Sequence, residues 1–100
     1  MEQNKLTPEQ EVVVDDVLAT TVAILGAHLN MDPMKLEFEH EVKTLFNDQV
    51  YEFASALLDI HIYYVVTVDY DPDRLFDMFK TIHDVCDYFA SAVLVKQNLL

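Results

Sequence analysis

The chain is 100 residues long and 52% hydrophobic, and its 18 acidic and 6 basic residues give a net charge of −12. This apolar content excludes a disordered chain, and the negative charge argues against direct binding to nucleic acid or to an anionic membrane surface. Because Cys86 is the only cysteine, neither a disulfide framework nor a cysteine zinc site can form.

A chain of this length forms one domain, so we assign residues 1–100 to a single helical unit with a flexible start at 1–7. Met1–Gln10 lacks the basic and apolar regions of a signal peptide. The longest uncharged run, Val17–Met31, is too short and too interrupted to span a bilayer. We therefore expect a cytoplasmic protein.

Each of the three prolines follows a residue that suits the N-cap of a helix, in Thr7-Pro8, Asp32-Pro33 and Asp71-Pro72. Proline is favoured at the first helical position, because the N–H that it lacks would be unpaired there. The Thr or Asp oxygen can accept a hydrogen bond from an early backbone N–H. The sequence therefore predicts an all-α protein, a small helical bundle of three long helices at about 8–29, 33–69 and 72–98.

The first predicted helix is apolar on nearly every side between Val17 and Ala27, apart from two threonines. Such a helix is normally surrounded, either by its own domain or by a second subunit. Gly26 and the neighbouring alanines would let another helix approach closely, or else they only weaken the helix slightly.

The middle segment raises a choice between helix and strand, because Ile60–Val68 has a strand-like composition. Apolar residues nevertheless recur every three or four positions through it, at Phe46, Val50, Phe53, Leu57, Ile60, Tyr64 and Val68. This spacing favours a helix. Asn47-Asp48 could cap a new helix and give four helices in total, or one helix of about 37 residues, ~55 Å long, could run through.

The last predicted helix carries a regular core stripe, with steps of four and three residues between Leu75, Phe79, Ile82, Cys86, Phe89 and Val93. This pattern indicates a helix and gives no sign of a cofactor. Cys86 lies in the stripe, so we expect an inert, buried thiol.

A second apolar stripe points away from the predicted core. It comprises Tyr51, Leu58, Ile62 and Val65 on the middle segment, with Phe76 and Leu94 similarly offset on the last helix. Exposed together, these side chains would make an apolar patch unusual for a soluble monomer. We expect a symmetric homodimer joined through these residues, and the alternative is a four-helix bundle in which both faces are internal.

Acidic residues follow two helix faces and the turn between them, at Glu37, Glu41, Asp48, Glu52, Asp59, Asp69, Asp71, Asp73, Asp77, Asp84 and Asp87. A solvated outer face explains such a pattern, but solvated helices commonly interleave Glu with Lys, and few such pairs occur here. Ordered carboxylates can also imitate the phosphates of a nucleic acid. We therefore predict a non-enzymatic inhibitor or regulator that occupies the basic, nucleic-acid-binding surface of a partner protein, as small phage and mobile-element inhibitors do in general character. The alternative is an assembly or adaptor protein that acts through its apolar helix faces.

Motifs for catalysis are incomplete, so we predict no catalytic, cofactor or metal residue. Glu37-x-x-His40 lacks the second motif of a di-iron bundle, and His83-Asp84 lacks the chain length of a metal-dependent phosphohydrolase. Asp84-x-x-Asp87 is one half of the acidic set of an all-α, magnesium-dependent nucleotide pyrophosphohydrolase, which stays a second alternative. The four histidines, at 28, 40, 61 and 83, are interpreted as structural, with one buried hydrogen bond expected for His61.

Overall fold

A computed structural model of the chain describes residues 6–66 and 71–100, and for 72 and 73 it describes the backbone alone. The predicted flexible start at 1–7 therefore lies mostly outside the described residues. The elements are α1 (Pro8–Leu29), a 3-10 turn η1 (Pro33–Lys35), α2 (Val42–Leu45), α3 (Val50–Tyr64), α4 (Pro72–Met78) and α5 (Ile82–Lys96). The described segments contain no strand, which confirms the all-α prediction.

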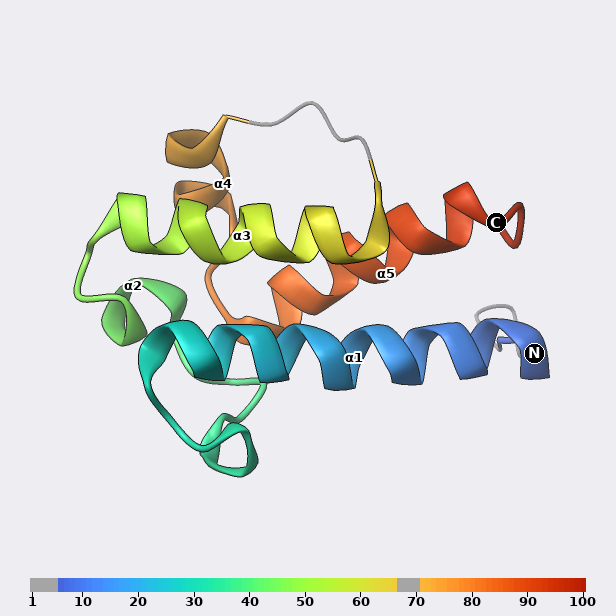
Figure 1. The fold of residues 1–100 in the computed structure, drawn as a ribbon, viewed down its shortest axis with the longest axis horizontal. Coiled ribbons are helices and arrows are strands. Elements are labelled where there is room, and N and C mark those ends of the chain that lie inside the picture. The colour runs from blue at the N-terminus through green and yellow to red at the C-terminus, as the bar shows by residue number, and fades with distance from the viewer. Residues whose placement is uncertain (1–5, 67–70) are drawn as a thin grey trace.

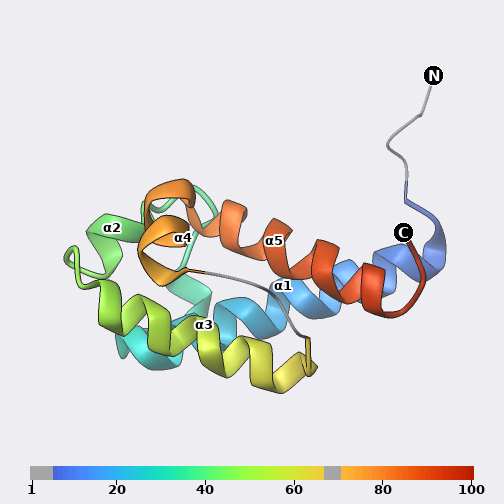
Figure 2. The same ribbon diagram turned by 90° about the horizontal axis from the view of Figure 1, so that it is seen from above.

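The three long helices lie side by side, and α1 runs in the opposite direction to α3 and α5 (Figure 1). Viewed from above, α5 is displaced from α3, so the three helices do not lie in one plane (Figure 2). The short helices α2 and α4 close the end at which α3 begins, and the start of α1 lies beside the C-terminal residues at the other (Figure 1). There the Gln10 side chain donates a hydrogen bond to the Leu99 carbonyl.

The first helix matches its predicted bounds, because Thr7 and Gln10 form a complete capping box at its start. Its end is set by Asn30, which adopts the left-handed conformation. Gly26 is buried, and its nearest neighbours belong to the chain that returns over it and to the start of η1. A Cβ at this position would lie 3.0 Å from the Met31 carbonyl oxygen and 3.2 Å from Pro33. The glycine therefore serves the return of the chain over the end of α1.

The length and composition of α1 also suit a membrane-spanning helix, and 22% of its most apolar 18-residue window is buried. Core helices of soluble proteins and N-terminal signal sequences have the same length and composition, so these two properties do not place α1 in a membrane. The helix packs on α5 and α3 with one side and exposes Val12, Ala19, Ala23 and Ala27 on another. The prediction that α1 is surrounded is therefore met on one side only within this chain.

The middle segment is divided, so the prediction of one continuous helix over 33–69 is wrong. Asp32 caps only the short turn η1, and the chain then runs without helix to Val42. A break does fall at Asn47-Asp48, where the four-helix alternative placed it, but the described residues form five α-helices, so that count is wrong as well, and the two residues do not cap a helix start. Both residues have positive φ, 52° and 58°, and they end α2, whereas Gln49 is the N-cap of α3.

The strand-like stretch is helical from Ile60 to Tyr64, which confirms the helix prediction for that part. The helix ends at Val65, and residues 67–70, including Val68 of the predicted stripe, lie outside the described residues.

The last predicted helix, 72–98, is also divided, because the chain leaves the helical path at Phe79-Lys80. Thr81 then starts α5 with a second capping box, in which Asp84 is the reciprocal partner. The backbone freed by the break pairs with the loop before α2: Val42 N–H donates to the Lys80 carbonyl at 2.9 Å, and Ile82 N–H donates to the His40 carbonyl at 3.1 Å. This contact ties the beginnings of α2 and α5 together.

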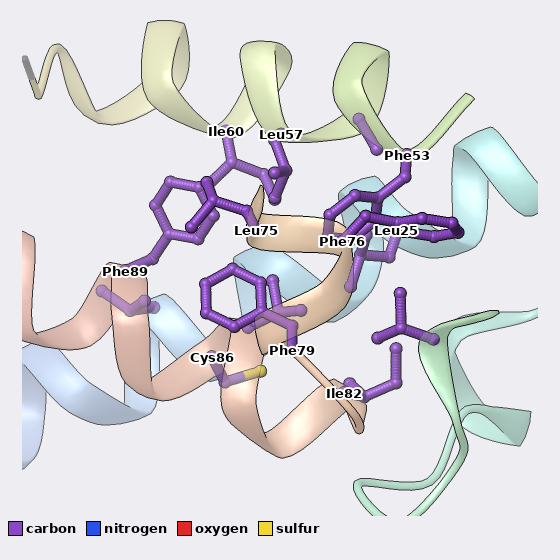
Figure 3. Packing of buried hydrophobic residues seen from close by; sticks show 14 of the residues in the cluster. Leu25, Phe53, Leu57, Ile60, Leu75, Phe76, Phe79, Ile82, Cys86 and Phe89 are labelled. Atoms are coloured by element: carbon purple, nitrogen blue, oxygen red, sulfur yellow. The ribbon is translucent and has the colours of Figure 1, made fainter. Parts of the chain in front are cut away.

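The core lies between α3, α4 and α5 and is closed by α1 (Figure 3). The predicted core stripes of the middle segment and of the last helix both point into it wherever their residues are described. Among their residues, Phe53, Leu57, Ile60, Ile82, Cys86 and Phe89 are fully buried. The Phe53 ring contacts the rings of Phe46, Phe76 and Phe79 at centroid distances of 5.5, 5.1 and 6.3 Å. One aromatic residue of α3 therefore organises the packing of α2 and α4.

Candidate functional site

The outward face of α3 is the most unusual surface of the molecule. Tyr51, Ile62 and Val65 are 85%, 64% and 72% exposed, and Leu58 and Tyr63 are also exposed. All but Tyr63 belong to the second apolar stripe predicted from the sequence, and their exposure agrees with the prediction that this stripe points away from the core. Tyr63 was missed because it lies beside the stripe. Like Glu52 and Asp59, Tyr63 comes one position after a stripe residue, so we call the four stripe residues Tyr51, Leu58, Ile62 and Val65 the outward face of α3.

Two further members of the predicted stripe do not belong to this surface. Phe76 and Leu94 are only 6% and 5% exposed, so their assignment to an exposed dimer surface is corrected. The break before α5 separates α4 from it and directs Phe76 toward the Phe53 ring (Figure 3). Leu94 is buried because α5 packs against α1 on one side and faces the core on the other.

Acidic side chains border the outward face along one edge. Glu52 and Asp59 each follow a stripe residue by one position, so both lie on the same side of the stripe. Both are exposed, and Asp59 is hydrogen-bonded to His28 of α1 at 2.6 Å. The surface is therefore apolar along its centre and negative along one edge.

The remaining predicted acidic residues are dispersed. Glu37 and Glu41 lie in the loop before α2 and Asp48 in the turn after it, all exposed, and Asp71 precedes α4. Asp69 and the Asp73 side chain lie outside the described residues. Asp77 belongs to α4, whereas Asp84 and Asp87 belong to α5. The acidic row predicted on one long helix is therefore split between two helices.

Several of these carboxylates also have partners within the chain. Asp77 accepts a hydrogen bond from Lys43 at 2.7 Å, which raises the pKa of the lysine. Asp84 accepts from the backbone N–H of Lys80 and Thr81. Asp87 lies 3.2 Å from His83. Charges used in this way are less available to a partner than free carboxylates would be.

The motifs considered for metal chemistry are engaged in local contacts. The Glu37 N–H donates to Nδ1 of His40 at 3.1 Å, and His83 and Asp84 make the contacts given above. Among the described residues, no three His, Cys, Asp or Glu side chains converge as metal ligands would.

Desolvation by burial is the largest cause of the pKa shifts of His61 and Cys86. Burial lowers the pKa of His61, although its Nδ1 is hydrogen-bonded to the Leu57 carbonyl at 2.8 Å, which opposes the shift. This is the buried hydrogen bond expected from the sequence. Burial, with a smaller contribution from Asp87, raises the pKa of Cys86 to about 12. The thiol is therefore protonated near neutrality, the unreactive form of cysteine.

The end of α3 has an unusual backbone. Asn30, Asn47 and Asn98 end their helices in the left-handed conformation, which asparagine tolerates. At the end of α3 the same role falls to Val65, with φ 53° and its N–H bonded to the Ile62 carbonyl. A β-branched residue is strained in this conformation. Sequence reasoning missed this feature because no glycine or asparagine marks the helix end.

No family model matches this chain, and no curated protein or solved structure matches it at a significant level.

Proposed function

We propose that this chain is a non-enzymatic protein-binding module and that the outward face of α3 is its binding surface. The observation that carries the proposal is the exposure of four large apolar side chains, Tyr51, Leu58, Ile62 and Val65, on the side of α3 that faces away from the core. Leaving that surface in water has a cost, because each buried side chain of this kind contributes about 1.5–3 kcal/mol. A partner that covers it recovers this free energy.

The spacing of the surface suits a helical partner. Tyr51, Ser55, Leu58, Ile62 and Val65 follow one another by four, three, four and three residues. This is the repeat with which one helix packs along another. An amphipathic helix laid along α3 would cover the stripe over its whole length, about 21 Å at 1.5 Å per residue.

The charge of the surface defines the chemistry of that helix. Glu52 and Asp59 stand along one edge, where Asp59 is also hydrogen-bonded to His28 at 2.6 Å, and the whole chain carries −12. A partner helix with Lys or Arg beside its apolar residues would meet opposite charges, which accelerates association and helps to fix its register. This proposal retains the predicted basic partner and moves the contact from dispersed acidic side chains to an apolar stripe with an acidic edge.

A second copy of the chain is the competing occupant, as in the predicted homodimer. In an antiparallel pairing of two α3 helices, Glu52 of one copy would face Asp59 of the other, and like charges in such positions are destabilising. Each copy would also bring its own charge of −12. A basic partner avoids both costs, so we favour it over self-association.

Site-specific photo-crosslinking tests the proposal. A photoreactive residue at Ile62, in the centre of the stripe, should give adducts with one protein through a peptide rich in Lys, Arg and apolar residues. The same residue at Met34, which is also apolar and exposed but lies on η1, is the matched control and should not give that adduct. Equal labelling from both positions contradicts the proposed surface. An adduct with a second copy replaces the basic partner by the homodimer.

A further inference from the structure

A groove of about 940 Å³ lies beside the end of α3, and the outward face does not include it except at Val65. One wall is the α5 face from Asp84 to Lys96, and the other comes from the ends of α3 and α4. Lys96 follows Asp84 by twelve positions, which at 1.5 Å per residue gives the groove a length of roughly 18 Å. The volume lies within the range of small-molecule sites, about 300–1,000 Å³.

The middle of the groove is apolar. Val66, Phe79 and Tyr88 line its walls, and Met78 and Val95 line it with exposed side chains. The Phe79 and Tyr88 rings contact each other at 5.2 Å between centroids, so this part of the wall is a packed aromatic surface. Such a lining favours a hydrocarbon chain over a polar ligand.

The two ends of the groove differ in charge. Asp84 and Asp87 stand at the end where α5 begins, and Lys96 stands at the other. The Lys96 ammonium already donates to the Tyr64 carbonyl at 2.8 Å, and Asp84 accepts two backbone N–H groups as a cap. Asp87 is exposed, and its one contact given by the structure is to His83. The acidic end is therefore suited to a cation.

One residue that lines the groove, Val65, has a strained backbone. Val65 lines the groove while it holds the left-handed conformation that asparagine adopts at the ends of α1, α2 and α5. Asparagine would satisfy the backbone with less strain, so the apolar side chain has a role that the backbone does not explain. Val65 belongs both to the outward face of α3 and to the groove, so that role fits either surface, and the ligand site rests on the other lining residues.

We propose that this groove binds a linear amphiphile whose cationic head group lies at Asp87 and whose hydrocarbon tail runs along Phe79, Tyr88 and Val95. This ligand site does not rest on the proposed partner helix, because the residues assigned to the ligand, Phe79, Asp87, Tyr88 and Val95, lie on α5 or directly after α4.

Three probes with the same twelve-carbon tail test the head group: dodecyltrimethylammonium, dodecyl maltoside and dodecyl sulfate, each titrated calorimetrically below its micelle concentration. We expect saturable binding of one molecule, about fivefold tighter for the cation than for the neutral probe, as an exposed ion pair allows, and weakest for the sulfate. Equal affinities overturn the cationic head group, and the absence of saturable binding overturns the site.

Matched variants locate the site. Ala92→Phe fills the groove and should weaken binding of the cation at least about tenfold, whereas Ala19→Phe on the exposed side of α1 should not change it. Asp87→Asn should lower the affinity for the cationic probe to that for the neutral probe. Glu52→Gln causes the same change in net charge and should leave the affinity for the cationic probe unchanged. If the two members of either pair behave alike, binding is non-specific and the proposal fails. Circular dichroism of each variant checks that the helices persist.

Discussion

The two faces of α3 are both apolar at helical spacing, yet they have opposite environments. Phe53, Leu57 and Ile60 are completely buried, while Tyr51, Leu58 and Ile62 point into solvent. The inward residues hold α2, α4 and α5 together, and the outward residues contribute little to the chain's own fold. Helical periodicity therefore identifies apolar stripes, but only the tertiary structure shows which stripe is the core.

The adjacent pair Leu57 and Leu58 gives the largest expected difference between the faces. Leu57→Ala removes a fully buried side chain and should lower the free energy of unfolding by about 2–5 kcal/mol. Leu58→Ala makes the same chemical change on a half-exposed residue and should cost less than about 1 kcal/mol. Urea unfolding of the two variants measures both values. Similar losses would show that the outward face is buried in solution, as in a dimer.

The second expected effect is a gain in the free energy of unfolding, and it concerns Val65 at the end of the outward face. Val65→Asn places in the left-handed position the residue that ends α1, and it should raise the free energy of unfolding by about 0.5–1 kcal/mol. The same substitution at Val66, the next position, relieves no positive φ and is the control. A loss of stability in Val65→Asn comparable with that of the control would contradict the strain.

The smallest expected effect depends on pH and belongs to His61, at the border of the inward face. The pKa of His61 is lowered from 6.5 in the folded chain, so over the interval below 6.5 the unfolded chain binds more protons than the folded one. Its contribution to stability is therefore fully present above pH 6.5 and declines as the pH falls through this interval. His61→Leu should lose the decline between pH 7 and about 5, a range above most carboxylate titrations. Thermal unfolding at several pH values gives the comparison, and an unchanged decline in the variant would assign it to other groups.

Sequence reasoning located the core well because burial follows periodicity. Leu75, Phe79 and Ile82 are buried as predicted, although the helix they were assigned to is broken between them. A stripe reports which side chains turn inward and does not report whether the backbone hydrogen bonds are continuous. The break itself has a readable signal, since Thr81 and Asp84 have the spacing of a capping box.

Other features of the structure could not be predicted from the sequence pattern of any one segment. Phe76 shares its helical offset with exposed residues, and only the placement of α4 against Phe53 buries it. The acidic row on the last helix failed for a related reason, because the wheel that aligned Asp77 with Asp84 assumes one unbroken helix. The groove between the end of α3 and α5 depends on the packing of separate elements, so no motif in one segment could have revealed it.

We propose that the chain folds with one face of α3 and leaves the other open to a different protein. Sedimentation equilibrium of the isolated chain, compared with Leu58→Glu, tests this proposal most directly. We expect the monomer mass of 11.6 kDa for both proteins at micromolar concentration, with the variant still folded. A mass of twice that value for the unmodified chain, reduced to the monomer mass by Leu58→Glu, would contradict it and assign the outward face to a second copy.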